Sequence, residues 1–176
     1  MDTSLWFFWA LQKYVAETGS GDKIWKEYGR KMKMILNGFR EGETVHVRMH
    51  ENGLLSQGAP GLALTWMDAF VEGKPVTPRT GLAVEVNALW YNAIKFSLEM
   101  AELGGEKKFV KEWSPVAESL PGAFVETFWD EESQYLADVV NEGKKDLSVK
   151  PNMLFAASLP YTMLDESKRM QVLEVV

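Results

Sequence analysis

Apolar residues follow helical periods in two kinds of segment that alternate at the start of the chain. Residues 2–19 are apolar nearly all round, with Asp2 or Thr3 as the cap and Gly19 as the stop, which predicts a helix buried on two sides. Residues 22–39 place apolar side chains on one face and Lys and Arg on the other, which predicts one buried face. We therefore expect an inner and an outer helix of one helical hairpin.

The same pairing recurs in the middle of the chain. Residues 84–103 are apolar on two sides, and residues 106–128 are apolar on one side. Pro115 and Pro121 lie within the second segment, where they should break or kink a helix. Residues 124–140 favour a hairpin of two short extended arms around a polar turn, although a helix end is an alternative for the first arm.

Two further segments complete the pattern. Residues 152–159 and 166–175 predict a third, shorter helical pair. Residues 43–82 contain several Gly and Pro and no sustained period, so we expect a loop region with short β-strands. A connection of this length within a compact domain is usually functional. No linker divides the chain, which predicts one mainly α-helical domain over residues 1–176.

Composition narrows the class of protein. The net charge is −6 and Lys and Arg are scattered, which argues against a nucleic-acid partner. The absence of Cys excludes disulfides, thiolate catalysis and Cys-based zinc sites, and it fits a cytoplasmic location. The apolar stretch at residues 4–11 is too short to span a bilayer, and no basic segment precedes it. We expect neither membrane insertion nor secretion.

Metal and cofactor chemistry has little support in the sequence. His46 and His50 alternate in "TVHVRMH" with no carboxylate cluster at ligand spacing, so we interpret them as surface or edge-strand residues. Neither a phosphate-binding Gly loop of standard spacing nor a "GxSxG" motif occurs. No metal and no cofactor is predicted, and carboxylate chemistry remains.

One carboxylate stands among aromatic residues. Asp68 lies between Trp66 and Phe70 in "LTWMDAF". Burial against aromatic rings disfavours the ionised form, so a protonated Asp68 could act as the general acid of glycoside hydrolysis. An Asp in such a motif is more often a hydrogen-bonded structural residue. The motif alone leaves both interpretations open.

A second group of polar residues follows in "PRTGLAVEVN". Arg79, Glu85 and Asn87 have side chains that can each hold two adjacent sugar hydroxyls. The alternative is an Arg–Glu ion pair at a helix start, with Glu85 at the positive end of the helix dipole. The seven Trp residues are equally ambiguous, because indole rings fill cores and also stack on sugars.

Four segments together resemble a known family. They are "DTSLWFFWALQKYV", "GLLSQGAPGLALTWMDAF", "PVTPRTGLAVEVNALWYNAI" and "VKPNMLFAASLP", and in this order they are similar to the amylo-α-1,6-glucosidase domain of glycogen debranching enzymes. Related signatures occur in other α/α-toroid glycosidases, such as neutral invertases. The resemblance implies a partial (α/α)6 toroid that belongs to a larger catalytic domain. Its implied activity is inverting hydrolysis of the α-1,6-linked glucose at branch points of glycogen or another branched α-glucan.

The resemblance also implies roles for individual residues. It places the general acid at Asp68. It places around the bound glucose the residues Asp2, Trp66, Arg79, Glu85, Asn87 and Asn152. Lys150 departs from the pattern, where Arg is expected before the "PN" pair.

The resemblance leaves the general base unassigned. Its segment is expected beyond Val176, so we expect the chain alone to have negligible activity and to be a truncated or excised piece. About half of a ring would expose apolar flanks, which predicts self-association in the isolated chain. Two other functional classes stay open: a glucan-binding module in which Trp66 and Trp90 stack on the sugar, and a helical interaction protein without a ligand.

Overall fold

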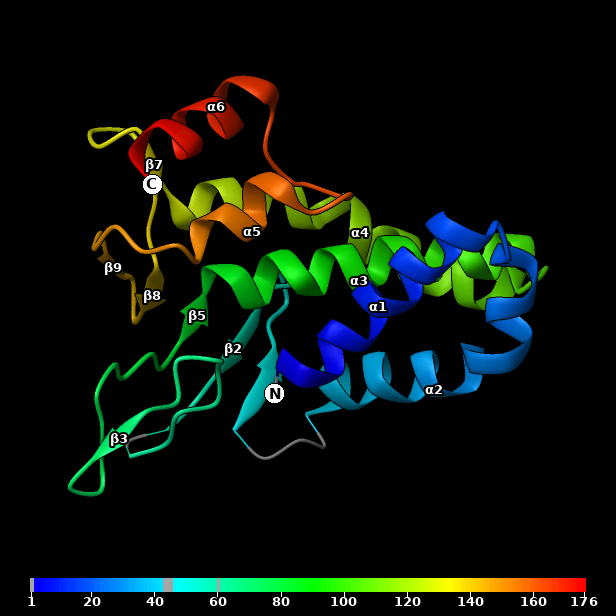
Figure 1. The fold of residues 1–176 in the computed structure, drawn as a ribbon, viewed down its shortest axis with the longest axis horizontal. Coiled ribbons are helices and arrows are strands. Elements are labelled where there is room, and N and C mark those ends of the chain that lie inside the picture. The colour runs from blue at the N-terminus through cyan, green and yellow to red at the C-terminus, as the bar shows by residue number, and fades with distance from the viewer. Residues whose placement is uncertain (1, 43–45, 60) are drawn as a thin grey trace.

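Helix α3 (Val84–Leu103) runs through the middle of the molecule, and four other helices pack around it (Figure 1). The computed structural model describes residues 2–42, 46–59 and 61–176. The other helices in these ranges are α1 (Asp2–Thr18), α2 (Gly21–Glu41), α4 (Lys107–Phe128), α5 (Met153–Ser158) and α6 (Glu166–Val175). Each helix lies where the apolar period predicts one, and the mainly helical class is confirmed.

The two helices that are apolar all round have different surroundings. Helix α3 contacts α1, α2, α4 and α5, and most of its side chains are buried, as predicted. Helix α1 packs mainly on α3 and buries Leu5, Phe8 and Leu11. Trp6 and Trp9 on its other side are only partly buried. The double burial predicted for α1 is therefore incomplete in this chain: Trp6 packs on Phe155 of α5 and Phe7 packs on Tyr28 of α2, but these aromatic rings stay partly exposed.

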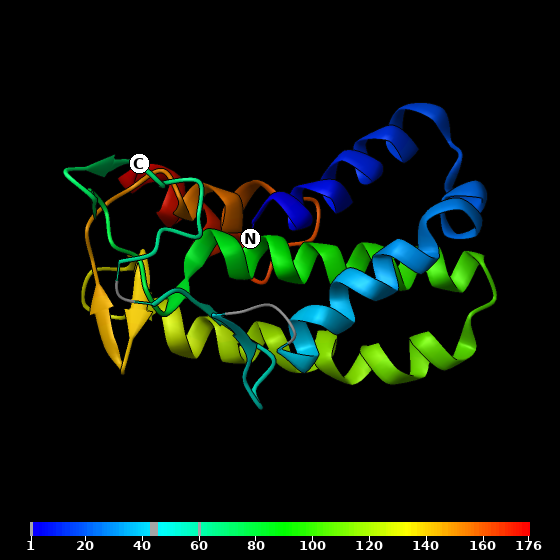
Figure 2. The same cartoon turned by 90° about the horizontal axis from the view of Figure 1, so that it is seen from below.

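Helix α4 continues through both of its prolines. It runs beside α3 as a single helix to Phe128, so the predicted break does not occur (Figure 2). Pro115 is exposed, and so is Lys111, whose carbonyl would have accepted the missing hydrogen bond. Water can solvate that carbonyl, which removes much of the cost of the proline.

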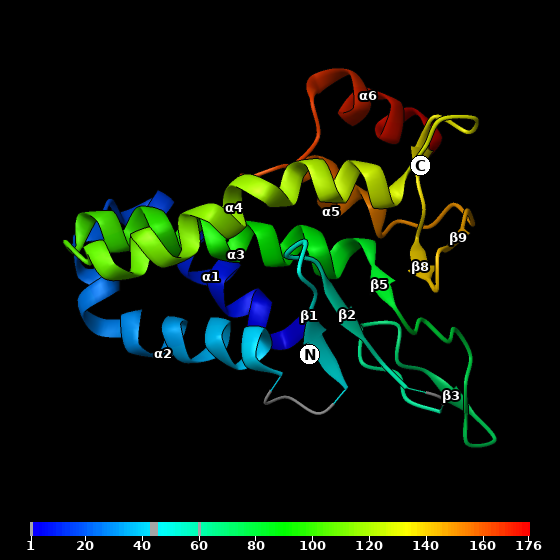
Figure 3. The same ribbon diagram turned by 180° about the vertical axis from the view of Figure 1, so that it is seen from behind.

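Short antiparallel strands gather at one end of the helices (Figures 1 and 3). They are β1 (Val47–Met49) with β2 (Leu55–Gln57), β3 (Phe70–Val71) with β4 (Lys74–Pro75), β6 (Trp129–Asp130) with β7 (Tyr135–Leu136), and β5 (Leu82–Ala83) with β8 (Val139–Asn141) and β9 (Lys144–Asp146). The β-containing region near 43–82 is confirmed for its described residues, while positions 43–45 and 60 lie outside them. The hairpin predicted over 124–140 is β6–β7, and its first five residues are the helix end given as the alternative.

Strand β5 joins the loop region to the helical body. Ala83 ends β5 directly before α3, and β5 pairs with β8, which lies far along the chain. Gly81 has φ +114°, and a Cβ there would stand 2.5 Å from the Val140 carbonyl oxygen, so only Gly permits this approach. Because the pairing is antiparallel, the segment before β5 lies beside the residues after β8, and Asp138, which precedes β8, lies beside the start of α3, where its carbonyl accepts from Val84 N–H at 3.0 Å. The Arg79 side chain reaches Asp138 at this junction.

Candidate functional site

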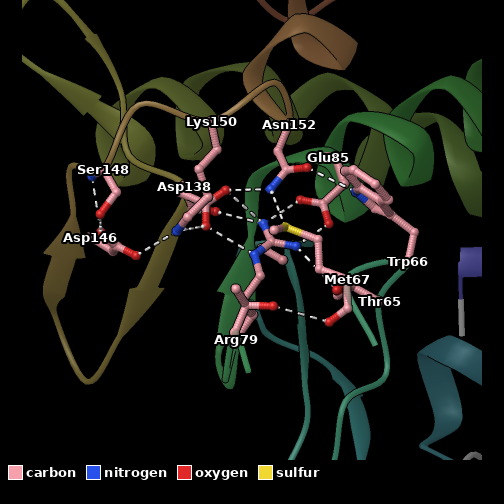
Figure 4. Close-up of polar contacts among 12 residues, drawn as sticks. Thr65, Trp66, Met67, Arg79, Glu85, Asp138, Asp146, Ser148, Lys150 and Asn152 are labelled. Carbon is pink, nitrogen blue, oxygen red and sulfur yellow. Dashed lines mark hydrogen bonds and ion pairs between the residues drawn. The ribbon is translucent and has the colours of Figure 1, made fainter. Parts of the chain in front are cut away.

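Arg79 is the centre of a buried cluster of charged residues (Figure 4). Its Nη1 and Nη2 donate to the two carboxylate oxygens of Glu85, and the Nη2–Oε2 distance is 2.6 Å. Its Nε and Nη2 donate to Oδ2 and Oδ1 of Asp138, both at 2.9 Å. Nη1 also donates to Thr65 Oγ1 at 3.2 Å. Burial lowers the pKa of Arg79, but the two carboxylates outweigh it and raise the pKa, so the guanidinium stays charged.

The cluster collects residues from separate elements. Arg79 stands just before β5, and Glu85 lies in the first turn of α3, where the helix dipole favours a negative charge. Asp138 directly precedes β8 and is completely buried. The ion pair between Arg79 and Glu85 is thus the structural alternative raised from the sequence. Sequence reasoning missed Asp138, although a carboxylate inside the apolar run "YLADVV" was a signal for it.

Lys150 links this cluster to the surface. Its Nζ donates to Asp138 Oδ2 at 2.8 Å and to Asp146 Oδ2 at 3.0 Å. Burial lowers the pKa of Lys150, but the hydrogen bonds to the two carboxylates outweigh it and raise the pKa above its usual range. Burial raises the pKa of Asp146, but hydrogen bonds from Ser148 and Lys150 outweigh it and bring the pKa from 3.8 to about 2. Lys150, which departs from the family pattern, therefore bridges two carboxylates.

Asn152 connects the cluster to an exposed aromatic ring. Its Nδ2 donates to Asp138 Oδ1 at 2.6 Å, and its Oδ1 accepts from Trp66 Nε1 at 2.8 Å. The Asn152 side chain is completely buried, whereas Trp66 is 49% exposed. The indole N–H of Trp66 is thus held by Asn152, while about half of the residue remains exposed to solvent.

Asp68 lies in a different environment from the one expected. It is exposed, and Phe70 on its other side is 48% exposed, so Asp68 is not buried between aromatic rings. The expectation of a desolvated carboxyl is wrong for this structure, because the loop runs over the surface. Asp68 and Trp66 nevertheless line one pocket of about 320 Å³, together with Met67, Ala69, Val76 and Thr77.

The remaining predicted sugar-binding residues lie apart from this pocket. Asn87 is completely buried and holds β2 on α3: its Oδ1 accepts from Leu55 N–H at 2.8 Å, and its Nδ2 donates to the Leu55 and Ala83 carbonyls. Asp2 is buried at the start of α1, where its carboxylate accepts from Thr3 N–H at 2.9 Å. Trp90 is completely buried and donates to the Gly53 carbonyl, so its ring cannot stack on a glucan as the binding-module hypothesis required.

The structure thus brings together four of the predicted residues, Trp66, Arg79, Glu85 and Asn152, around the unpredicted Asp138. His46 is exposed before β1, and His50 follows that strand. Over the described residues, no three His, Asp or Glu side chains meet in a group that could bind a metal ion. Within the same ranges, no helix has both the length and the apolar run needed to cross a bilayer.

Comparisons with known proteins show a similar fold and identify the family. The GH78 family rhamnosidase of Bacillus sp. GL1 has a similar structure, with a TM-score of 0.67 and 18% identity over 97% of this chain. The chain spans 16% of that protein, and at this identity the likeness concerns the fold alone. A search of curated protein sequences gave no match. The amylo-alpha-1,6-glucosidase family matches residues 1–176, so the chain belongs to that family of glycoside hydrolase-like proteins.

Proposed function

We propose that this chain supplies the general acid, Asp68, of an inverting glycosidase that removes α-1,6-linked glucose from a branched α-glucan such as glycogen. The observation that carries the proposal is that Asp68 and Trp66 line the same pocket. The carboxylate can reach a leaving oxygen there, and the half-exposed indole offers a flat face for the C–H groups of a sugar ring. Family membership supports the choice of a glucosidic bond.

In the proposed reaction, Asp68 protonates the oxygen that links glucose to the glucan as the bond to the anomeric carbon breaks. Water attacks that carbon from the opposite face, which inverts its configuration. A second carboxylate about 6.5–9.5 Å from Asp68 would activate the water. Because Asp68 is exposed in the free chain, its desolvation would come from the bound glucan, which covers the pocket.

The same proposal includes the arrangement of the helical pairs in a larger ring. We propose that α1 to α6 form about half of an (α/α)6 toroid, in which a neighbouring helix covers the parts of Trp6 and Trp9 that this chain leaves exposed. The partly buried state of these two rings supports the idea, since large aromatic surface is costly to expose. In the isolated chain, this face would favour self-association, which light scattering can measure.

The test compares Asp68→Asn with Glu72→Gln in the full-length enzyme that contains this chain. Both carboxylates are exposed and close in sequence, so both variants should fold. Release of glucose from a branched dextrin should fall by about 10²–10⁴-fold in kcat for Asp68→Asn, because the general acid is lost, and should stay unchanged for Glu72→Gln. Normal glucose release by Asp68→Asn would rule out the catalytic role.

A glucan-binding module is the second candidate, and the open faces of Trp66 and Asp68 favour it equally. In that case the unmodified enzyme binds branched dextrin, measured by calorimetry, without releasing glucose. Asp68→Asn would then alter binding and leave no hydrolysis to lose. A protein that neither binds nor cleaves the dextrin would contradict both functions.

A further inference from the structure

We infer that Asp138 is a positioning residue, which acts through Asn152 to hold the Trp66 ring at the pocket beside Asp68. The effect of this role on glucan binding rests on the proposed function. The positioning itself is a property of the free protein and can be tested without any ligand.

The donor and acceptor atoms in these contacts determine the orientation of the Asn152 amide. A carboxylate only accepts hydrogen bonds, so the amide nitrogen of Asn152 must face Asp138. The amide oxygen of Asn152 is then turned toward Trp66, whose indole N–H only donates. Asp138 therefore determines which way the Asn152 amide faces, and this orientation creates the acceptor for the indole.

Asp138 is itself held in place by donors alone. Arg79, Lys150 and Asn152 all donate to its two oxygens, and the side chain is completely buried. Replacing one oxygen with an NH₂ group would turn a donor toward these donors. An Asn at this position would therefore disrupt the contact to Asn152 or to one of the cations.

The Trp66 ring receives its support from Asn152, while its chain neighbours Thr65 and Met67 have hydrogen bonds of their own, from Arg79 Nη1 at 3.2 Å and from Thr77 Oγ1 at 3.4 Å. Trp66 is half exposed and lies in the irregular segment between β2 and β3. Its indole nitrogen is tied to Asn152, which lies 86 residues along the chain at the start of α5. Asp68 is two residues from Trp66, so this contact and those at Thr65 and Met67 together hold the segment that carries the proposed acid.

Glu85 offers a matched control for Asp138. Both are buried carboxylates that pair with Arg79, so removing either charge removes one of the two ion pairs of the same guanidinium. Asp138 also accepts from Asn152, whereas the hydrogen bonds found for Glu85 in the described ranges are to Arg79. A general loss of stability would affect Glu85→Gln and Asp138→Asn alike, whereas a loss of positioning would appear only in Asp138→Asn.

The experiment observes the indole N–H of Trp66 by NMR in protein labelled with ¹⁵N-tryptophan. Trp66→Phe identifies the signal by its disappearance. In Asp138→Asn, we expect this signal to move and its hydrogen exchange to speed up by roughly fivefold to tenfold, the factor expected from one lost hydrogen bond. In Glu85→Gln, it should keep its position and its exchange rate. Equal changes in both variants, or none in Asp138→Asn, would overturn the proposal.

Asn152→Ala keeps the test decisive if Asp138→Asn fails to fold. It removes the contact to Trp66 and leaves Asp138 paired with Arg79 and Lys150. The Trp66 signal should change in this variant too, and an unchanged signal would refute the proposal. Binding of a branched dextrin distinguishes the positioning of Trp66 from the proposed function. If the indole signal shifts as expected but the protein does not bind dextrin, only the proposed function is contradicted. If a folded variant has a shifted indole signal and still binds dextrin with unchanged affinity, the position of the Trp66 ring does not affect glucan binding.

Discussion

The buried charge cluster and the exposed Trp66–Asp68 segment belong to one predicted sugar site, yet they use their polar atoms in opposite ways. Arg79 and Glu85 direct their charges at each other and at Asp138, inside the protein. Trp66 and Asp68 keep a ring face and a carboxylate toward solvent at one pocket. A polar residue in a recognisable motif can therefore support a site and leave ligand contact to its neighbours.

The largest expected effect comes from breaking the support. Replacing Arg79 with Met leaves Glu85 buried without its cation and leaves Asp138 paired with Lys150 alone. An uncompensated buried charge is strongly destabilising, so the free energy of unfolding at pH 7 should fall by about 3–5 kcal/mol. Urea denaturation followed by circular dichroism measures this change.

The matched control for that prediction is Arg30→Met. Arg30 is exposed on α2, so removing its charge should change the free energy of unfolding by no more than about 0.5 kcal/mol. If the two variants lose similar amounts of stability, the buried cluster does not support the site as described.

An intermediate effect is expected on the exposed side of the comparison. Trp66→Ala should weaken binding of a branched dextrin about fivefold, because a stacked aromatic face is worth about 1 kcal/mol. Its free energy of unfolding should change little, since half of the side chain is already in water. Isothermal titration calorimetry and urea denaturation give the two numbers.

Trp66→Phe sharpens this result. Phe keeps a ring but loses the N–H that Asn152 accepts. Affinity retained by Phe and lost by Ala would assign the binding to the ring face, whereas equal losses would assign it to the indole hydrogen bond. Unchanged affinity in both variants would exclude Trp66 from glucan binding.

The smallest expected effect is a pH dependence at the edge of the cluster. The folded state holds the pKa of Asp146 at about 2, below 3.8, so Asp146 stabilises the fold above about pH 4. This contribution is lost as the pH falls from about 4 through about 2. Its size is limited because the Asp146 side chain is 44% exposed.

Ser148→Ala tests this contribution. It removes the hydroxyl that donates to Asp146 and keeps the backbone N–H bond at 2.9 Å, so the pKa of Asp146 should move back toward 3.8. The unmodified protein should be more stable than the variant at pH 6, and the difference should shrink between pH 4 and pH 2. Urea denaturation across this range checks it, and a difference independent of pH would assign the effect of Ser148 to something other than the ionised Asp146.

Apolar periodicity predicted the positions of the helices well, because 3.6-residue patterns depend on local geometry. The hairpin β6–β7 and the strand-containing region after α2 were also predicted, since short arms around polar turns have a clear pattern. The pairing of β5 with β8 and the strand β9 were not predicted. Strands of two or three residues carry too little pattern to be predicted, and the partner of β5 lies more than 50 residues away.

By itself, the sequence determined the helical pairs, the family and the motif that contains Asp68. That Asp138 meets Arg79, that Asp68 is exposed, and that α3 is buried far more completely than α1 follow from the tertiary structure alone. The physical reason is common to all three. The residue types and their spacing predict which face of an element must be covered. The segment that covers it lies far along the chain, and its position depends on the packing of the whole chain.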